Sequence, residues 1–205
     1  MGEIYVRILV MRYLSLISCY VNATVSPQYS VLLAARDVEI RLYHESSWIS
    51  APVMGGTSSF NKSTHDGFHR LYQYIHGANE DDTMLQIAKP ILTTITSTPN
   101  GLDYLVNMYL PSKPPMPSPQ LNLHISNWKS RCIAIRTFPG FAQDDNIYKE
   151  RSSLSFSLAK GFNGKNISVS EDKSSYSIAQ YNSSSHNSGR VNEVWVNVLT
   201  CPSVH

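Results

Sequence analysis

Charged residues are scarce in this chain: they make up 16% of its 205 residues, against 42% hydrophobic and 10% aromatic residues. Disordered chains and coiled coils are rich in charge and poor in aromatic residues, so this composition excludes both classes. The 17 basic and 15 acidic residues give a formal net charge of +2, with no run of like sign. We therefore expect no nucleic-acid partner, because such partners are bound through concentrated positive charge.

The chain also lacks the short motifs of the common catalytic classes. It contains no GxSxG nucleophile elbow, no Walker loop and no dinucleotide-binding fingerprint. His65 and His69 have the spacing of a zinc-binding helix, but Asp66 stands where a metalloprotease has its glutamate, and no distant third ligand can be identified. The sequence therefore shows no motif of these catalytic classes and predicts no zinc site, while a dyad of Cys132 with a histidine stays open as an alternative.

Long hydrophobic runs are missing except near the N-terminus. Residues 8–21 are apolar and end in the small polar run Asn22-Ala23-Thr24. This pattern resembles a secretory signal peptide over residues 1–23, although Glu3 before the run and Arg12 inside it are unfavourable for such a signal. A poorly ordered extension or an extra strand is the alternative. No other run approaches the ~20 residues that span a bilayer, so we expect no membrane span.

Cysteine is rare as well, with three residues in the chain. Removal of the signal takes Cys19 away and leaves Cys132 and Cys201, which can form one disulfide or remain two buried free thiols. Sequons for N-linked glycans begin at Asn22, Asn61, Asn166 and Asn182. These features agree with secretion, and we expect an extracellular protein, with a cytoplasmic location as the alternative.

Proline divides the chain near its middle. Five prolines fall within residues 111–119, which excludes helix and central strand there and marks a connector. Before it, the hydrophobic pattern predicts a helix over 64–76, with Ser63 as N-cap and Gly77 as the stop. Strands are predicted at 29–35, 38–43, 48–53, 85–96 and 102–110.

The same order recurs after the connector. A helix is predicted over 144–160, and strands are predicted at 121–125, 131–138, 174–181 and 193–199. The halves, about 29–110 and 120–199, thus share the order strand, strand, helix, strand, strand, with one additional strand before the helix in the first half. This repeat predicts an α+β fold, a distorted antiparallel β-barrel with two helices, built from two pseudo-repeated halves around a shared core.

Four segments of the chain form a recognisable set, at residues 38–43, 67–79, 136–141 and 192–195. Their order and spacing resemble those of the SOUL haem-binding protein family, over a domain that we place at 24–205. The resemblance implies a distorted barrel made from a duplicated half, similar to bacterial multidrug-effector-binding domains. It also implies that haem or another tetrapyrrole is bound in an open apolar groove without catalysis, for buffering or transport.

Two positions depart from the family pattern. The usual Met-Thr-x-Pro-Val segment is here Ile87-Ala88-Lys89-Pro90-Ile91, and the histidine that some members carry in the second strand is Leu42. These departures favour an alternative function, a protein-interaction module that keeps the scaffold and has lost its ligand. A hydrolase or small-molecule sensor built on the same pocket is a third hypothesis.

The first predicted helix carries the candidate ligand residues. At ~100° per residue, Phe68 and Tyr72 belong to one apolar stripe, and three histidines lie along its edge: His65, His69 and His76. A porphyrin needs apolar contact and its iron accepts an imidazole nitrogen, so His69 and His65 are candidate haem iron ligands. The alternative is that the stripe is core and the histidines are solvated.

Gln73 and Arg70, on the same helix, complete the predicted binding site. Phe68, Tyr72 and Gln73 align with positions that line the groove in members of the family, as the resemblance implies. Arg70 is a candidate partner for a haem propionate through a charge-assisted hydrogen bond, with a surface role as the alternative.

Overall fold

Nine strands and two α-helices make up the described part of the chain. The computed structural model describes residues 25–53, 59–111, 113–160, 169–182 and 189–202. The elements, with a 3-10 helix η1, are β1 Tyr29–Ala34, β2 Glu39–Tyr43, β3 Ser46–Val53, α2 Phe60–Ile75, β4 Ile91–Thr98, β5 Gly101–Leu110, η1 Pro119–Leu121, β6 His124–Trp128, β7 Arg131–Pro139, α3 Ile147–Lys160, β8 Ser175–Gln180 and β9 Val191–Asn197.

All these strands join one antiparallel sheet, in the order β1-β2-β7-β9-β8-β4-β5-β3-β6. The order is symmetric about the contact between β4 and β8, since β5, β3 and β6 follow on one side and β9, β7 and β2 on the other. The predicted pseudo-repeat is therefore confirmed, with β1 as an extra strand at one edge. The first strand of each repeat pairs with a strand of the other repeat. Strand β2 pairs with β7, and β6 pairs with β3.

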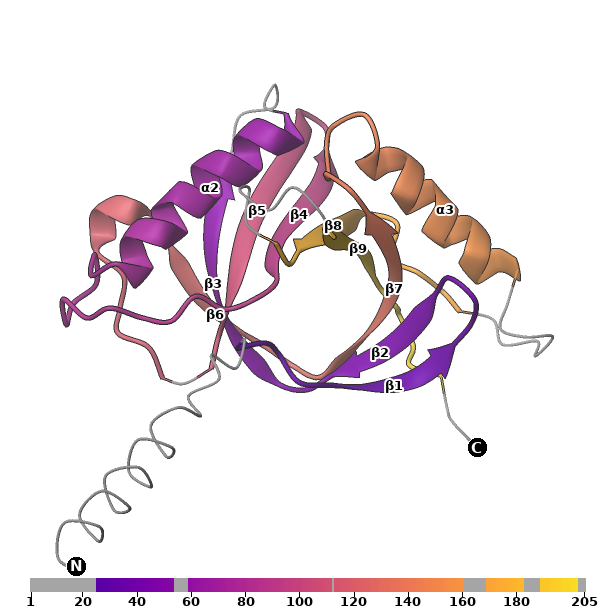
Figure 1. Ribbon diagram of the computed structural model, residues 1–205, viewed down its shortest axis with the longest axis horizontal. Helices are drawn as coiled ribbons and strands as arrows, with labels where there is room; N and C mark the ends of the chain where they lie inside the picture. Colours follow the sequence, from indigo (N-terminus) through magenta and orange to yellow (C-terminus); the bar gives the residue numbers. More distant parts are fainter. Residues whose placement is uncertain (1–24, 54–58, 112, 161–168, 183–188, 203–205) are drawn as a thin grey trace, which may run out of the picture.

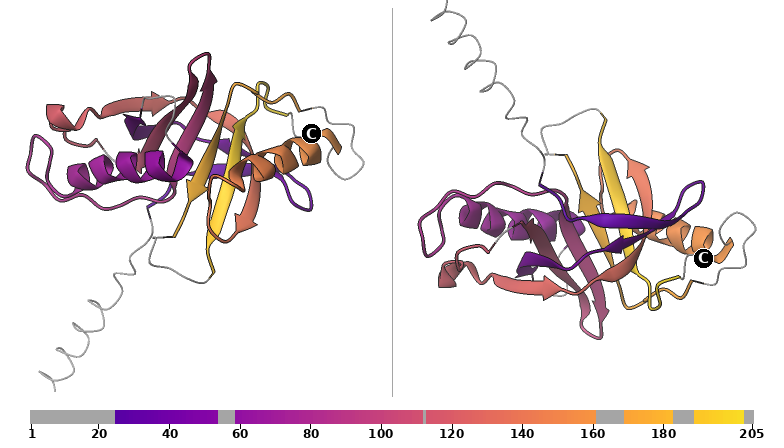
Figure 2. Two further views of the ribbon diagram at one scale, coloured as in Figure 1. Left: turned by 90° about the horizontal axis from the view of Figure 1, so that it is seen from above. Right: turned by 90° about the horizontal axis from the view of Figure 1, so that it is seen from below.

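The sheet curls into an open half-barrel, and the two helices lie over it at different places along the long axis (Figures 1 and 2). Helix α2 contacts β3 and β5, whereas α3 contacts β7 and β9. The predicted α+β fold, a distorted barrel with two helices, is thus confirmed. Gly67 allows α2 to approach β5 closely, because a β-carbon at this position would collide with the side chain of Val106 in β5.

Helix α2 begins four residues earlier than the sequence predicted, at Phe60 rather than at residue 64. Ser59 is the N-cap, whose side chain accepts from the backbone N–H of Lys62 at 3.2 Å, so the prediction of Ser63 as N-cap was wrong. The extra turn is supported by Asp144, whose Oδ1 accepts from the N–H of Phe60 at 2.6 Å. This acceptor comes from the other half of the chain, so the local pattern could not reveal it.

Two predicted strand boundaries were also wrong. Strand β4 begins at Ile91 rather than at residue 85, because Pro90 has no N–H to donate to a ladder. Strand β6 begins at His124 rather than at residue 121, because η1 precedes it and Asn122 adopts a left-handed backbone, with φ at 46°. The other predicted strands agree with the structure within a few residues.

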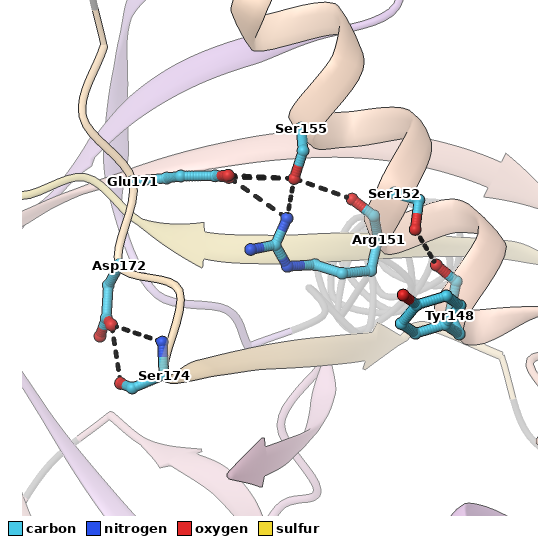
Figure 3. A network of polar contacts seen from close by, with 7 residues as sticks. All are labelled: Tyr148, Arg151, Ser152, Ser155, Glu171, Asp172 and Ser174. Atoms are coloured by element: carbon cyan, nitrogen blue, oxygen red, sulfur yellow. Dashed lines mark hydrogen bonds and ion pairs between the residues drawn. The ribbon is translucent and has the colours of Figure 1, made fainter. Parts of the chain in front are cut away.

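A polar network joins α3 to the segment before β8 (Figure 3). Arg151 Nη1 lies 3.2 Å from Glu171 Oε2, and the Ser155 hydroxyl donates to Glu171 Oε1 at 3.0 Å. The side-chain and backbone hydrogen bonds that Ser174 donates lower the pKa of the Asp172 carboxyl. The contacts of Arg151 and Ser155 with Glu171 anchor α3 to this segment.

The sequence left two states open for Cys132 and Cys201, and the structure contains the disulfide. Their Cα atoms lie 5.4 Å apart, a separation typical of disulfides. Because Cys132 lies in β7 and Cys201 follows β9, the bond fixes the end of the described chain to the sheet.

Candidate functional site

An open groove of about 450 Å³ lies beside the N-terminal half of α2. The helix forms one wall, and the others come from the segment before β4, the loop after β7, the end of β8 and the residue before β9. Three of these walls are remote in sequence from α2. We call this the α2 groove, and its lining residues are Asn61, Thr64, His65, Phe68, Ile87, Ala88, Lys89, Ile91, Phe141, Ala142, Gln143, Gln180, Tyr181, Asn182 and Arg190.

The α2 groove combines apolar walls with positive charge. Phe68 is half-buried, and Phe141 is 47% exposed. Lys89 and Arg190 supply two cations, and no acidic residue lines the groove among the described residues. The Arg190 guanidinium lies 3.9 Å from the centre of the Phe141 ring, a cation–π contact that holds the charge beside the apolar surface.

Of the three predicted histidines, the structure places only His65 in the lining of the α2 groove. Its side chain is 80% exposed, and its Nδ1 lies 3.2 Å from Asp66 Oδ1. His69 is exposed and belongs to none of the described hollows around the helix. The three histidines that helical periodicity predicts along one edge therefore do not share one hollow.

Tyr72, Gln73 and His76 line a second hollow, of about 440 Å³, at the C-terminal half of α2. His76 stacks on Tyr72 with ring centroids 3.8 Å apart, and its Nδ1 lies 2.8 Å from the Tyr72 carbonyl oxygen. Because a carbonyl only accepts, Nδ1 carries the proton, which leaves Nε2 unprotonated in the neutral ring. The Phe68 and Tyr72 rings, 6.2 Å apart, connect the two hollows along the helix.

Arg70 belongs to the lining of neither hollow, and its guanidinium donates to backbone carbonyls. Its Nη2 donates to Pro52 at 2.6 Å, and its Nη1 lies 3.4 Å from the carbonyl oxygens of Leu121 and Asn122. These contacts tie α2 to the end of β3 and to η1. The charged residues that do line the α2 groove, Lys89 and Arg190, were not among the predicted site residues, because they lie outside the helix.

A buried network holds the Tyr181 wall of the groove. The Tyr181 hydroxyl donates to Glu193 Oε2 at 2.6 Å, and the Trp195 indole donates to the same oxygen at 2.7 Å. Arg41 Nη1 lies 2.9 Å from Glu193 Oε1, and the two side chains are 8% and 7% exposed. Burial, followed by the charge of Glu193, raises the pKa of Tyr181 far above its ordinary value, so its hydroxyl stays protonated and donates.

The described residues contain no cluster of three or more His, Cys, Asp or Glu side chains able to hold a metal ion. The α2 groove nevertheless suits a haem group, because it offers apolar walls, two cations for carboxylates and one accessible imidazole. No helix in the described ranges has the length and hydropathy required to cross a bilayer.

Comparison with known proteins finds chains that resemble this one. A family model described as "SOUL heme-binding protein" matches residues 24–197. Human "Heme-binding protein 2" is 27% identical, covering 77% of this chain and 76% of the relative. The mouse protein of the same name is 28% identical, covering 81% and 80%.

Solved structures resemble the chain in fold alone. The EcmrR C-terminal domain has a TM-score of 0.54 at 10% identity, covering 84% of this chain and 99% of that domain. A hydrolase from Listeria innocua has a TM-score of 0.52 at 8% identity, covering 80% and 92%.

Proposed function

Since the chain belongs to the SOUL haem-binding family, we propose that it binds haem or another tetrapyrrole non-covalently in the α2 groove. The role is buffering or transport rather than catalysis. The observation that carries the proposal is the pairing of apolar walls with Lys89 and Arg190 and with no acidic residue in the described lining. This chemistry suits a flat apolar ligand with carboxylates at one edge.

The macrocycle of the ligand matches the apolar walls of the groove, and its propionates match the two cations. Phe68 and Phe141 contact the macrocycle, and burial of apolar area drives the association. Lys89 and Arg190 receive the propionates through charge-assisted hydrogen bonds, which are stronger than neutral ones. Tyr181, held by Glu193, keeps a further wall in place. The open form of the groove favours weak, reversible binding, as a carrier requires.

The charge of Lys89 provides the first test. The Lys89→Ala variant is expected to raise the Kd for hemin roughly tenfold or more, because one charge-assisted contact to a propionate is lost. Titration followed by the Soret band and by tryptophan quenching measures it. Lys173→Ala is the matched control, since Lys173 is exposed and does not line the groove. Equal affinities for the two variants would remove Lys89 from the site.

We propose His65, which lines this groove, as the iron ligand, with His69, one helical turn further on and outside the groove lining, as the alternative. Hemin bound to the His65→Ala/His69→Ala variant is expected to show a displaced Soret maximum relative to the wild-type complex. Metal-free protoporphyrin, which has no iron to ligate, is expected to bind both proteins equally. An unchanged hemin spectrum in the double variant contradicts ligation by either histidine and leaves binding of the macrocycle intact.

A protein-interaction module that has lost its ligand is the second candidate function. The observation that favours it is Leu42, which packs against the hydrophobic core at the position where some members carry a histidine. Hemin titration separates the two functions. A protein that causes no Soret shift and shows no tryptophan quenching at micromolar hemin is not a carrier.

We also propose that the protein is secreted. Support comes from the apolar run at residues 8–21, which lies outside the described residues, and from the Cys132–Cys201 disulfide. Disulfides persist in oxidising compartments and are rare in the cytosol.

A further inference from the structure

We propose that Asn61 carries an N-linked oligosaccharide that stands at the entrance of the α2 groove. The proposal rests on the proposed secretion, because oligosaccharide transfer takes place in the secretory pathway. The glycan would make access to the groove depend on a modification of the chain rather than on the fold alone.

The position of Asn61 suits a modified residue. It is the second residue of α2, it is exposed, and it lines the α2 groove next to Thr64 and His65. The helix start is capped by Ser59 and by Asp144, whose carboxylate accepts from the backbone N–H groups of Phe60 and Asn61. The cap therefore involves the backbone N–H of Asn61 and does not involve its side-chain amide.

Ser63, the third residue of the sequon Asn61-Lys62-Ser63, supplies an independent observation. Its side chain is fully buried, and its hydroxyl has no hydrogen-bond partner among the described residues. A buried hydroxyl without a partner destabilises a fold, so the folded protein with alanine at position 63 should be at least as stable as the protein with serine. The hydroxyl is needed before folding, because the sequon requires Ser or Thr two residues after the asparagine.

The transfer requires one co-reactant, a lipid-linked oligosaccharide pyrophosphate. The bond between sugar C1 and the pyrophosphate oxygen breaks, and a bond between C1 and Asn61 Nδ2 forms. The amide nitrogen loses one proton, and the lipid pyrophosphate leaves with the electron pair of the broken bond. No oxidation or reduction occurs.

A second sequon reaches the same groove. Asn182, which lies 121 positions along the chain from Asn61, lines another wall, and its Oδ1 accepts from the backbone N–H of Val191 at 3.0 Å. A glycan joins through Nδ2, so this contact is compatible with modification. The sequons at Asn22 and Asn166 lie outside the described residues. Both sequons with a described asparagine thus border the groove.

The test uses the full chain, with its own N-terminus, produced in a eukaryotic host. Peptide mapping before and after peptide-N-glycosidase treatment reports the state of Asn61. We expect a glycopeptide from the wild type and from Ser63→Thr, and an unmodified peptide from Asn61→Gln and Ser63→Ala. An unmodified Asn61 in the wild type, in the medium or in the cells, overturns the proposal.

Two further measurements separate this proposal from the haem proposal. Unglycosylated protein, made in bacteria and refolded with its disulfide, reports hemin binding independently of any glycan. In that material Ser63→Ala should unfold at the same temperature as the wild type or higher, and a clear decrease would contradict our reading of the hydroxyl. Hemin should associate several-fold more slowly with the glycosylated wild type than with Ser63→Ala from the same host, which lacks the glycan at Asn61 and keeps every residue that lines the groove. Equal rates would contradict a glycan at the entrance.

Discussion

The Arg41→Ala variant is expected to lose about 3–5 kcal/mol of unfolding free energy, because it leaves a buried carboxylate without its counter-charge. Glu193 is 7% exposed on its side chain and is paired with Arg41 at 2.9 Å. In the variant, the hydroxyl of Tyr181 and the indole of Trp195 still donate to Glu193, but neither brings a positive charge. Urea unfolding at neutral pH measures the loss.

Matched variants distinguish charge burial from loss of side-chain volume. Adding Glu193→Gln to Arg41→Ala removes the unpaired charge, keeps an acceptor for Tyr181 and should restore part of the lost stability. Arg36→Ala removes an exposed arginine and should change stability by about 0.5 kcal/mol or less. An Arg41→Ala variant as stable as Arg36→Ala would contradict the role given to the ion pair.

Removal of the Cys132–Cys201 disulfide is the second change with a large expected effect. The bond closes a loop with a sequence separation of 69 residues, and the chain-entropy estimate for such a loop is about 4 kcal/mol at 25 °C. Cys201→Ala isolates this effect, because Cys201 is exposed whereas Cys132 is 1% exposed. Denaturant unfolding of the oxidised wild type and the variant measures it.

The double variant Cys132→Ala/Cys201→Ala adds the cost of a small cavity in the core and should be slightly less stable than Cys201→Ala. Reduction of the wild type should reproduce the Cys201→Ala midpoint. A midpoint that changes neither on reduction nor in Cys201→Ala contradicts a stabilising bond.

The sequence predicted the architecture well because its signals were local. Alternation, helical periodicity and glycine stops place most elements, and their repeated order gives the symmetric sheet. The segments that carry the family resemblance also meet in space. Arg41 of the first pairs with Glu193 of the fourth, and Asn192 of the fourth donates to the Gly140 carbonyl of the third at 2.8 Å. These motifs therefore report packing as much as ligand binding.

The groove could be predicted only on its helical side. Periodicity and the family resemblance pointed to His65 and Phe68 of α2, and both residues line the groove. Helical periodicity could not show that Tyr72 and His76 line a different hollow. The facing walls come from residues brought in by tertiary structure: Lys89, Phe141, Tyr181 and Arg190.

Paramagnetic broadening of backbone amide signals by bound ferric haem, with diamagnetic zinc protoporphyrin as the control, tests whether the tetrapyrrole lies in the α2 groove. We expect strong broadening at Thr64, Phe68, Ala142 and Tyr181, which line the α2 groove, and none at the exposed face of α3 around Tyr148. Broadening confined to the hollow around Gln73 and Gln120, or no broadening at saturating hemin, would contradict this placement.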